Sequence, residues 1–200
     1  MRNPNPKIIP LIKKTALSML MKKNPSEIGM RDIAAKCKIT ATTIYHYYKD
    51  KDELFQAISL DCIRNLNTLI TEAAQKGSGP KENVLLAIRA FRDWCFKNPR
   101  LSILVMQGIK SAEDENGSAI EEYYVCNRTG EALLSECVSL GLAVSENVAL
   151  DVGILISGLW GCIEAVILKK SDSQHWKDGT VFTDHFINTW ARAVFTGGKK

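Results

Sequence analysis

Apolar residues recur every three or four positions along most of the chain, and this period predicts helices rather than strands. Proline and glycine interrupt the pattern and set the ends of the expected segments. We expect about nine helices, over residues 10–23, two short ones within 29–48, and then 51–76, 81–97, 100–110, 119–141, 147–170 and 180–196. No segment alternates as a strand would, so the fold class predicted is all-α.

The two short helices within residues 29–48 share a small apolar core. Ile33 lies in the first of them, and Ile44 and Tyr48 lie four residues apart in the second, on one face. Thr40 is placed to cap the second helix, and Asp50 to cap the helix that follows. Two short helices joined by a tight turn predict a helix-turn-helix, which indicates binding to double-stranded DNA.

The outer face of this segment carries hydroxyls, aromatic rings and cations. Small and hydroxylic residues at the start of the second helix suit contact with base edges, and tyrosine hydroxyls and cations suit phosphate oxygens. The candidate DNA-binding residues are Arg31, Thr40, Ala41, Thr42, Thr43, Tyr45, His46, Tyr47 and Lys51. The alternative is an ordinary solvated amphipathic helix.

This segment resembles the DNA-binding domain of the tetracycline-repressor (TetR) family of bacterial transcription regulators. The resemblance is carried by Ile33-Ala34, Cys37–Thr40, Thr43–Tyr48 and Lys51–Leu54. It implies that Arg31 and residues 41–43 approach bases or adjacent phosphates, and that Thr40, Tyr45, Tyr47 and Lys51 clamp the DNA backbone. Lys38 departs from the family pattern, which has glycine in the turn, so we expect strain there.

The distribution of charge divides the chain just after the helix-turn-helix. Residues 1–51 hold 11 Lys and Arg against 3 Asp and Glu, whereas residues 52–200 hold 15 against 19. A basic head on an acidic body is the distribution expected of a DNA-binding protein. We therefore expect a DNA-binding domain over 1–51 and a helical regulatory and dimerisation domain over 52–200.

The last two expected helices are unusually apolar and predict a homodimer interface. Residues 152–163 carry no charge on any face, and a helix of that kind must be covered on both sides. The candidate interface residues are Ile156, Leu159, Ile163, Phe182, Phe186 and Trp190. A four-helix interface between two subunits is also what the resemblance implies, and the alternative is a core wholly within one subunit.

A ligand pocket in the helical body is implied by the resemblance and supported weakly by the residues. Binding pockets are mostly apolar with a few polar groups. The candidates are Phe91, Trp94, Cys95, Met106, Tyr123, Tyr124 and Trp160, although aromatic residues at helical spacing are more often core.

Several other kinds of protein are disfavoured by the sequence. There is no phosphate-binding loop, nucleophile elbow or paired His and Cys cluster, so we expect neither an enzyme nor a metal site nor a cofactor. The six cysteines are scattered, which suits reduced thiols in a cytoplasmic protein. We see no signal peptide, and we read the apolar run 152–168 as a buried helix rather than a membrane span.

The sequence thus favours a transcriptional repressor that binds a palindromic operator as a homodimer and is released by a small-molecule effector. Two alternatives stay open. One is a helical interaction protein whose head docks an acidic protein through Arg31, Lys49 and Lys51. The other is a regulator that responds to thiol oxidation rather than to a small molecule.

Overall fold

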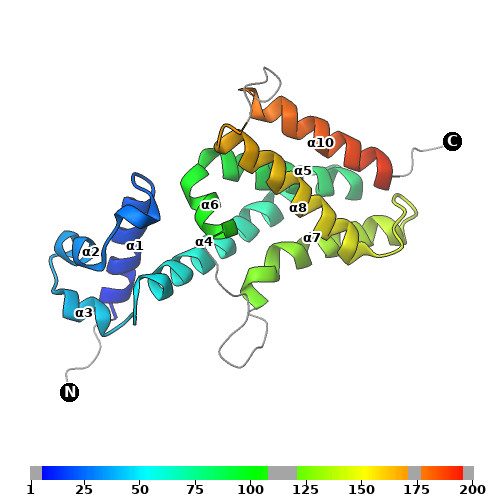
Figure 1. Ribbon diagram of the computed structural model, residues 1–200. Coiled ribbons are helices and arrows are strands. Elements are labelled where there is room, and N and C mark those ends of the chain that lie inside the picture. Colours follow the sequence, from blue (N-terminus) through cyan, green and yellow to red (C-terminus); the bar gives the residue numbers. More distant parts are fainter. Residues whose placement is uncertain (1–5, 108–120, 171–176, 196–200) are drawn as a thin grey trace. The chain divides into compact units, whose positions relative to one another are not determined.

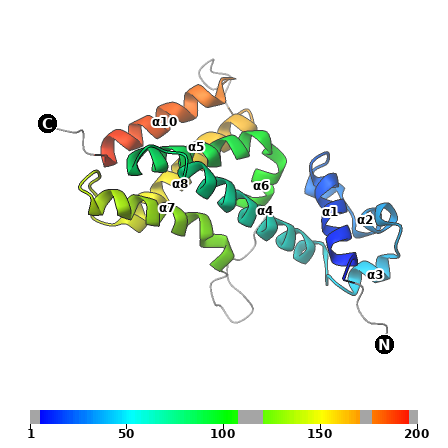
Figure 2. The same cartoon turned by 180° about the vertical axis from the view of Figure 1, so that it is seen from behind.

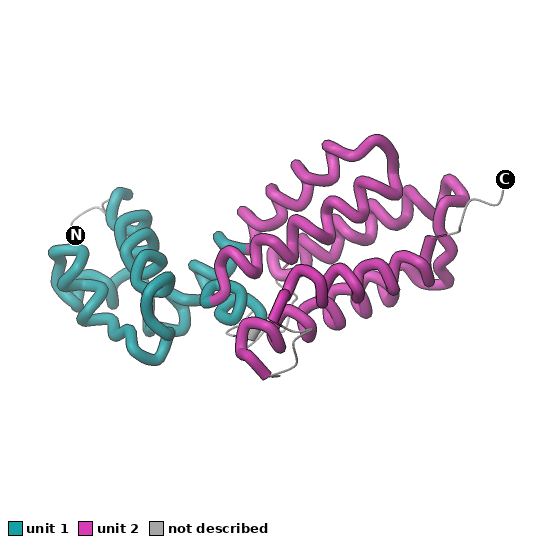
Figure 3. The backbone as a smooth tube through the Cα atoms, turned by 90° about the horizontal axis from the view of Figure 1, so that it is seen from above, with its two compact units in different colours: residues 1–62, 100–112 teal, residues 63–99, 113–200 magenta. Residues whose placement is uncertain are grey.

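The computed structural model describes residues 6–107, 121–170 and 177–195. The chain divides into two compact units, one of residues 1–62 with 100–112 and one of residues 63–99 with 113–200 (Figure 3). The regular elements of the described residues are all helical, which confirms the all-α fold class. One isolated bridge, between Ala143 and Phe195, is the sole β-type pairing in that part of the chain.

The first unit holds the short helices near the amino terminus. These are α1 (Ile8–Leu20), the 3₁₀ turn η1 (Pro25–Glu27), α2 (Met30–Cys37), α3 (Ala41–Tyr45), the first half of α4 (Lys51–Ala74), and α6 (Pro99–Gln107). Their shared core includes Ile12, Ile33, Ile44 and Leu54, whose side chains are fully buried. The predicted core of the helix-turn-helix is therefore confirmed (Figure 1).

A polar contact ties α1 to α4 within this unit. The Lys13 ammonium lies 2.8 Å from an Asp61 carboxylate oxygen and 3.4 Å from the Ala57 carbonyl oxygen. Both charged side chains are partly exposed, so we assign the pair to fixing the angle of the two helices more than to stability.

The second unit is a bundle of longer helices. It holds the second half of α4, α5 (Pro80–Lys97), α7 (Glu121–Ser139), α8 (Val148–Ile167) and α10 (Gly179–Val194). Helix α8 contacts α7, α5 and α10, and the views from front and back agree on this arrangement (Figures 1 and 2). Leu134, Leu159, Ile163 and Ile187 form its most buried part.

Glycine allows α8 and α10 to approach closely at one point. A Cβ atom on Gly158 would lie 2.5 Å from Cζ of Phe186, a distance that no real packing tolerates. The Phe186 ring of α10 therefore rests on the bare backbone of α8, which fixes the register of the two helices.

The observed helix ends lie close to the predicted ones. Helix α1 begins at Ile8 and so includes Pro10 in its first turn, where the missing N–H does no harm. Helix α3 ends at Tyr45, although hydrogen bonds from Tyr47 and Tyr48 to the Ile44 carbonyl continue its direction. The predicted acidic loop 111–118 and the end of the helix predicted over 100–110 lie outside the described residues.

Candidate nucleic-acid interface and regulatory cavity

The turn between α2 and α3 is built on a lysine in the left-handed conformation. Lys38 has φ 56° and ψ 41°, and the Ile39 N–H donates to the Ala34 carbonyl 3.1 Å away, as in a helix end closed by glycine. A residue with a Cβ atom is destabilised by roughly 1–2 kcal/mol in this conformation. The strain expected at Lys38 is therefore present, and the turn keeps the geometry that glycine gives.

Both predicted helix caps are confirmed. The Thr43 N–H donates to Thr40 Oγ1 at 3.2 Å, and the two threonine hydroxyls lie 2.9 Å apart. At the start of α4, the Glu53 N–H donates to Asp50 Oδ1 at 2.9 Å, while Glu53 Oε2 accepts from the Lys49 N–H at 2.5 Å. Caps on two successive helices hold α3 in a fixed orientation within the unit.

The structure leaves the predicted DNA-binding side chains outside the core. Arg31, Thr40, Thr42 and His46 are exposed, and Tyr45 is 52% exposed. The remaining four are half-buried: Ala41, Thr43, Tyr47 and Lys51. An exposed tyrosine beside exposed hydroxyls gives a surface that can follow both base edges and phosphate oxygens.

Two of these side chains have partners within the unit. The ring of His46 meets that of Tyr47 edge to face, with centroids 5.4 Å apart. The Lys51 ammonium donates to the Pro25 carbonyl at 3.1 Å and lies 5.8 Å from the centre of the Phe55 ring. One of the three ammonium hydrogens is thus used in a hydrogen bond within the unit, and the other two can be donated to an anion.

Sequence reasoning about this surface passed over two further cations. Lys36, near the end of α2, and Lys38, in the turn, are both exposed. The count of basic residues in the first 51 residues was the signal that pointed to them, but Lys36 lies at no position of the motif and Lys38 stands where the motif has glycine.

The second unit contains a small cavity enclosed by four helices. Its volume is about 50 Å³, and its exposed lining is wholly apolar. The lining residues are Ile70, Ala87, Ile88, Phe91, Cys126, Gly130, Val152, Leu155, Ile156 and Leu159. A cavity of this composition accepts hydrocarbon and offers nothing to a charged group.

Of the seven predicted ligand-binding residues, Phe91 alone lines this cavity. Cys95 is buried in the core, and Trp94, Tyr123, Tyr124 and Trp160 are half-buried away from the lining. Met106 belongs to α6 of the first unit.

Two small residues line the cavity. Ala87 lines it from α5, and Gly130 lines it from α7, where an added Cβ would lie 3.0 Å from Val152 Cγ1. The Val152 side chain thus already packs against the Gly130 backbone. That aromatic residues of this unit bind a ligand stays a prediction.

The predicted dimer residues fall into two groups. Leu159, Ile163 and Trp190 are buried inside the subunit, and Ile156 lines the cavity, so these four pack within one chain. Phe182 and Phe186 are half-buried on α10. The apolar side chains Leu150 and Ile154 of α8 are instead 63% and 64% exposed, and the interface itself stays a prediction.

Burial keeps the thiols of this unit protonated. Desolvation raises the pKa of Cys126 to about 12, and desolvation with the neighbouring Cys126 raises that of Cys95 to about 12. In the first unit, burial and the Asp61 charge raise the pKa of Cys62 to about 11. A thiol reacts as its thiolate, so these three are poor candidates for oxidation sensing at neutral pH.

Neither a metal site nor a membrane span is indicated. The described residues contain no cluster of three or more His, Cys, Asp or Glu side chains able to hold a metal. Helix α8 is long and apolar enough to cross a membrane by composition. It packs Val152, Leu155 and Leu159 into the core, as a central helix of a bundle does, and so does not indicate a membrane protein.

Both the helix-turn-helix region and the fold of this chain are similar to those of known proteins. Residues 12–58 match the family model described as bacterial regulatory proteins, tetR family. No curated protein matches the chain. Among solved structures, a protein of unknown function from Rhodococcus sp. RHA1 is similar, with a TM-score of 0.80 at 11% identity, covering 98% of this chain and 100% of that one.

Two further solved structures are similar over most of their length. The transcriptional regulator FadR from Bacillus subtilis, in complex with stearoyl-CoA, gives a TM-score of 0.73 at 14% identity, covering 92% of this chain and 97% of that one. A TetR family transcription regulator from Marinobacter aquaeolei VT8 gives 0.68 at 13%, covering 98% and 100%. At these identities the likeness shows the fold alone.

Proposed function

We propose that this chain, whose residues 12–58 match the family model of the tetR bacterial regulatory proteins, is a cytoplasmic transcriptional repressor of that family. It binds a palindromic operator as a homodimer and leaves it when a small apolar effector enters the second unit. The observation that carries the proposal is α3 itself. Capped by Thr40, it presents Thr42 and Tyr45 to solvent within a unit that also exposes the lysines Lys36, Lys38 and Lys49.

The two helices at the surface of the second unit support dimerisation. Helix α8 exposes Leu150 and Ile154, and α10 exposes Val181 at 60%. Exposed apolar side chains on adjacent helices are covered when a second copy packs against them. Two α3 helices about 34–36 Å apart would then reach successive major grooves on one side of the DNA.

Helix α4 is the element suited to carry the signal. Its first half lies in the first unit, with Lys51 and Phe55, and its second half lines the cavity through Ile70. An effector that binds better to one orientation of α4 shifts the dimer toward that orientation. If the spacing of the two α3 helices changes, one of them no longer fits its half-site, and the dimer dissociates from the operator.

The cavity supports an effector with a hydrocarbon part. Its lining offers no polar contact to a headgroup, so any charged part of the effector must lie outside it. Stearoyl-CoA, which is in complex with FadR in one of the similar structures, has such a hydrocarbon part and is a first compound to test.

The experiment is selection of binding sites from genomic DNA by the purified protein, followed by affinity measurements at several salt concentrations. We expect a palindromic site whose affinity falls steeply with salt, because lysine and arginine contacts release counterions from the phosphates. Recovery of no preferred sequence would overturn the proposal, since phosphate attraction alone has no sequence preference.

Variants separate the two kinds of contact. Thr42→Ala is expected to weaken the free energy of operator binding by about 1–3 kcal/mol through the loss of contacts to one base pair. The preference for a particular base at that position should become weaker. Tyr45→Phe removes a hydroxyl alone and is expected to weaken all sequences equally. Thr68→Ala is the matched control, since Thr68 is an exposed threonine of α4 whose hydroxyl donates to its own helix.

A further inference from the structure

A groove between α5 and α10 lies apart from the proposed DNA-binding surface and from the apolar cavity. It has a volume of about 550 Å³ and is open to solvent. Its lining residues are Lys81, Leu85, His185, Asn188, Ala191, Arg192 and Phe195. It shares no lining residue with the apolar cavity, and all of its residues belong to the second unit.

Two cations, Lys81 and Arg192, line this groove together with His185, and no acidic side chain lines it. Lys81, His185 and Arg192 are all exposed, and none of the three forms an ion pair within the described part of the chain. They come from two helices and converge on one hollow. Cations that face one another without a counterion repel, and an anion between them relieves that repulsion.

The Arg192 guanidinium is already oriented. Its Nε donates to the Asn188 carbonyl at 3.2 Å, and its Nη2 donates to Thr189 Oγ1 at 3.4 Å, so the planar group is held along the surface of α10. Its Nη1 makes no hydrogen bond to the described residues and stays available. Lys81 is likewise placed, with its ammonium 5.2 Å from the centre of the Phe195 ring.

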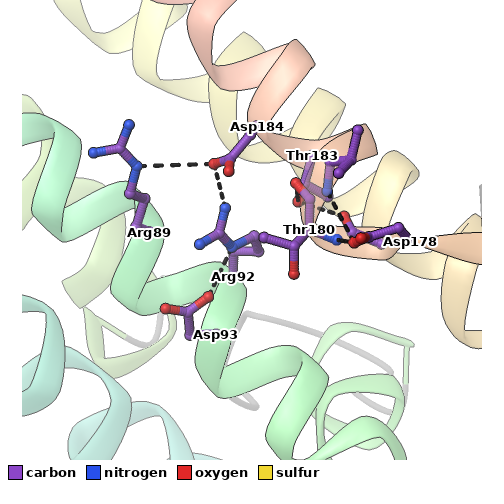
Figure 4. A network of polar contacts seen from close by, with 9 residues as sticks. Arg89, Arg92, Asp93, Asp178, Thr180, Thr183 and Asp184 are labelled. Atoms are coloured by element: carbon purple, nitrogen blue, oxygen red, sulfur yellow. Dashed lines mark hydrogen bonds and ion pairs between the residues drawn. The ribbon is translucent and has the colours of Figure 1, made fainter. Parts of the chain in front are cut away.

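The acid next to the groove in sequence is already neutralised. Asp184 precedes His185 on α10, and its carboxylate receives Arg92 and lies 3.8 Å from Arg89 Nε (Figure 4). Arg92 in turn donates through Nε to Asp93 at 2.7 Å. Two arginines of α5 thus neutralise the Asp184 carboxylate, so this carboxylate attracts Lys81 and Arg192 only weakly.

Part of the groove lining is apolar. Leu85, Ala191 and Phe195 contribute this apolar surface beside Lys81, His185 and Arg192. A bare inorganic ion would leave this surface unused, whereas an organic anion would cover it. A phosphate group supplies two negative charges and three acceptor oxygens, enough for cations that approach from both helices.

From these contacts we propose that the α5–α10 groove binds a phosphate monoester of a small apolar or aromatic group. The phosphate lies between Lys81 and Arg192 with His185 at its side, and the apolar group lies on Leu85 and Ala191. This site is separate from the operator and from the effector cavity, so it is a second place at which a metabolite can bind.

The experiment is calorimetric titration of the full chain with phenyl phosphate, with inorganic phosphate and phenol as comparisons. We expect saturable binding of phenyl phosphate that is tighter than that of either comparison. Lys81→Gln and Arg192→Gln should each weaken it by roughly tenfold, the loss of one charge-assisted contact. Asn188→Glu, which places an anion in the groove, should abolish it.

Arg128→Gln is the matched control. Arg128 is an exposed arginine of α7 outside the groove, and its replacement should leave the affinity unchanged. Binding that survives the Lys81, Arg192 and Asn188 substitutions would come from another basic surface and would overturn the proposal. Absence of saturable binding would overturn it equally, as would inorganic phosphate binding as tightly as phenyl phosphate.

Discussion

The two units of this protein are both helical, but they expose different kinds of side chain. The first keeps polar side chains on its surface and fixes them with caps, so that Thr42 and Tyr45 are exposed over fully buried Ile44. The second hides a small apolar space among long helices and leaves apolar side chains of α8 on its surface. The proposed function assigns the first unit to a charged polymer and the second unit to hydrocarbon and a second copy.

This difference shows where a substitution is expected to act. A change on the surface of the first unit removes contacts with DNA and leaves the fold intact. A change inside the second unit alters packing, and therefore alters stability before it alters binding. The four predictions below test this separation, in order of expected size.

The largest effect is expected from Ile154→Arg on the outward face of α8. Ile154 is 64% exposed in the subunit, so the fold should survive, whereas a charge at the centre of an apolar interface should prevent pairing. A monomer holds one half-site, and operator affinity should fall by roughly 10²–10⁴. Light scattering after size-exclusion chromatography and gel-shift titration would measure both.

Leu69→Arg is the control for that experiment. Leu69 is also an exposed aliphatic residue, 45% exposed, but it lies on α4. The variant should remain dimeric and bind the operator normally. A dimeric Ile154→Arg protein would show that α8 does not form the interface.

The next effect is a loss of stability from Leu159→Ala. Leu159 is 1% exposed and lines the cavity, so truncation enlarges a space that the bundle cannot collapse. The free energy of unfolding should fall by about 2–5 kcal/mol, as measured by urea denaturation. Leu69→Ala, at an exposed position, should change it by less than about 0.5 kcal/mol. Equal losses for the two variants would contradict the assignment of Leu159 to the core.

The sequence predicts the two units unequally well, and the reason is physical. In the first unit, Thr40, Asp50 and Lys38 act through bonds to residues within four positions, so local sequence specifies their geometry. The predicted core residues Ile33, Ile44 and Tyr48 are all buried for the same reason.

In the second unit, the cavity depends on contacts between segments far apart in the sequence. Ala87, Gly130 and Val152 come from three helices, and nothing local marks the point at which they meet. Leu159 and Ile163 were predicted at the dimer interface but are buried within the subunit, because an apolar helix does not by itself show which side meets its own core and which meets a partner. Of the aromatic residues predicted for a pocket, Phe91 lines the cavity, and the ligand-binding role of all of them stays a prediction.

A smaller effect is expected from Thr40→Ala, which removes the cap of α3. The Thr43 N–H loses its acceptor, and the free energy of unfolding should fall by about 1 kcal/mol. Thr40→Ser keeps the hydroxyl and should retain most of the stability. Thermal unfolding without DNA is the measurement, since Thr40 is also a candidate phosphate contact. If Ala and Ser behaved alike, the cap would not contribute.

The smallest effect is expected at Lys38, and its sign is opposite. Lys38 has φ 56°, so replacing it with glycine removes roughly 1–2 kcal/mol of backbone strain. Glycine also makes the unfolded chain more flexible, which costs roughly 0.5–1 kcal/mol. The net result should be a gain in stability of about 0.5 kcal/mol, measured by urea denaturation. Lys36→Gly, two residues earlier in helical conformation, has no strain to relieve and should lose up to about 1 kcal/mol. A loss at both positions would show that the left-handed turn is not strained by the lysine side chain, because the two variants differ in backbone conformation and in little else.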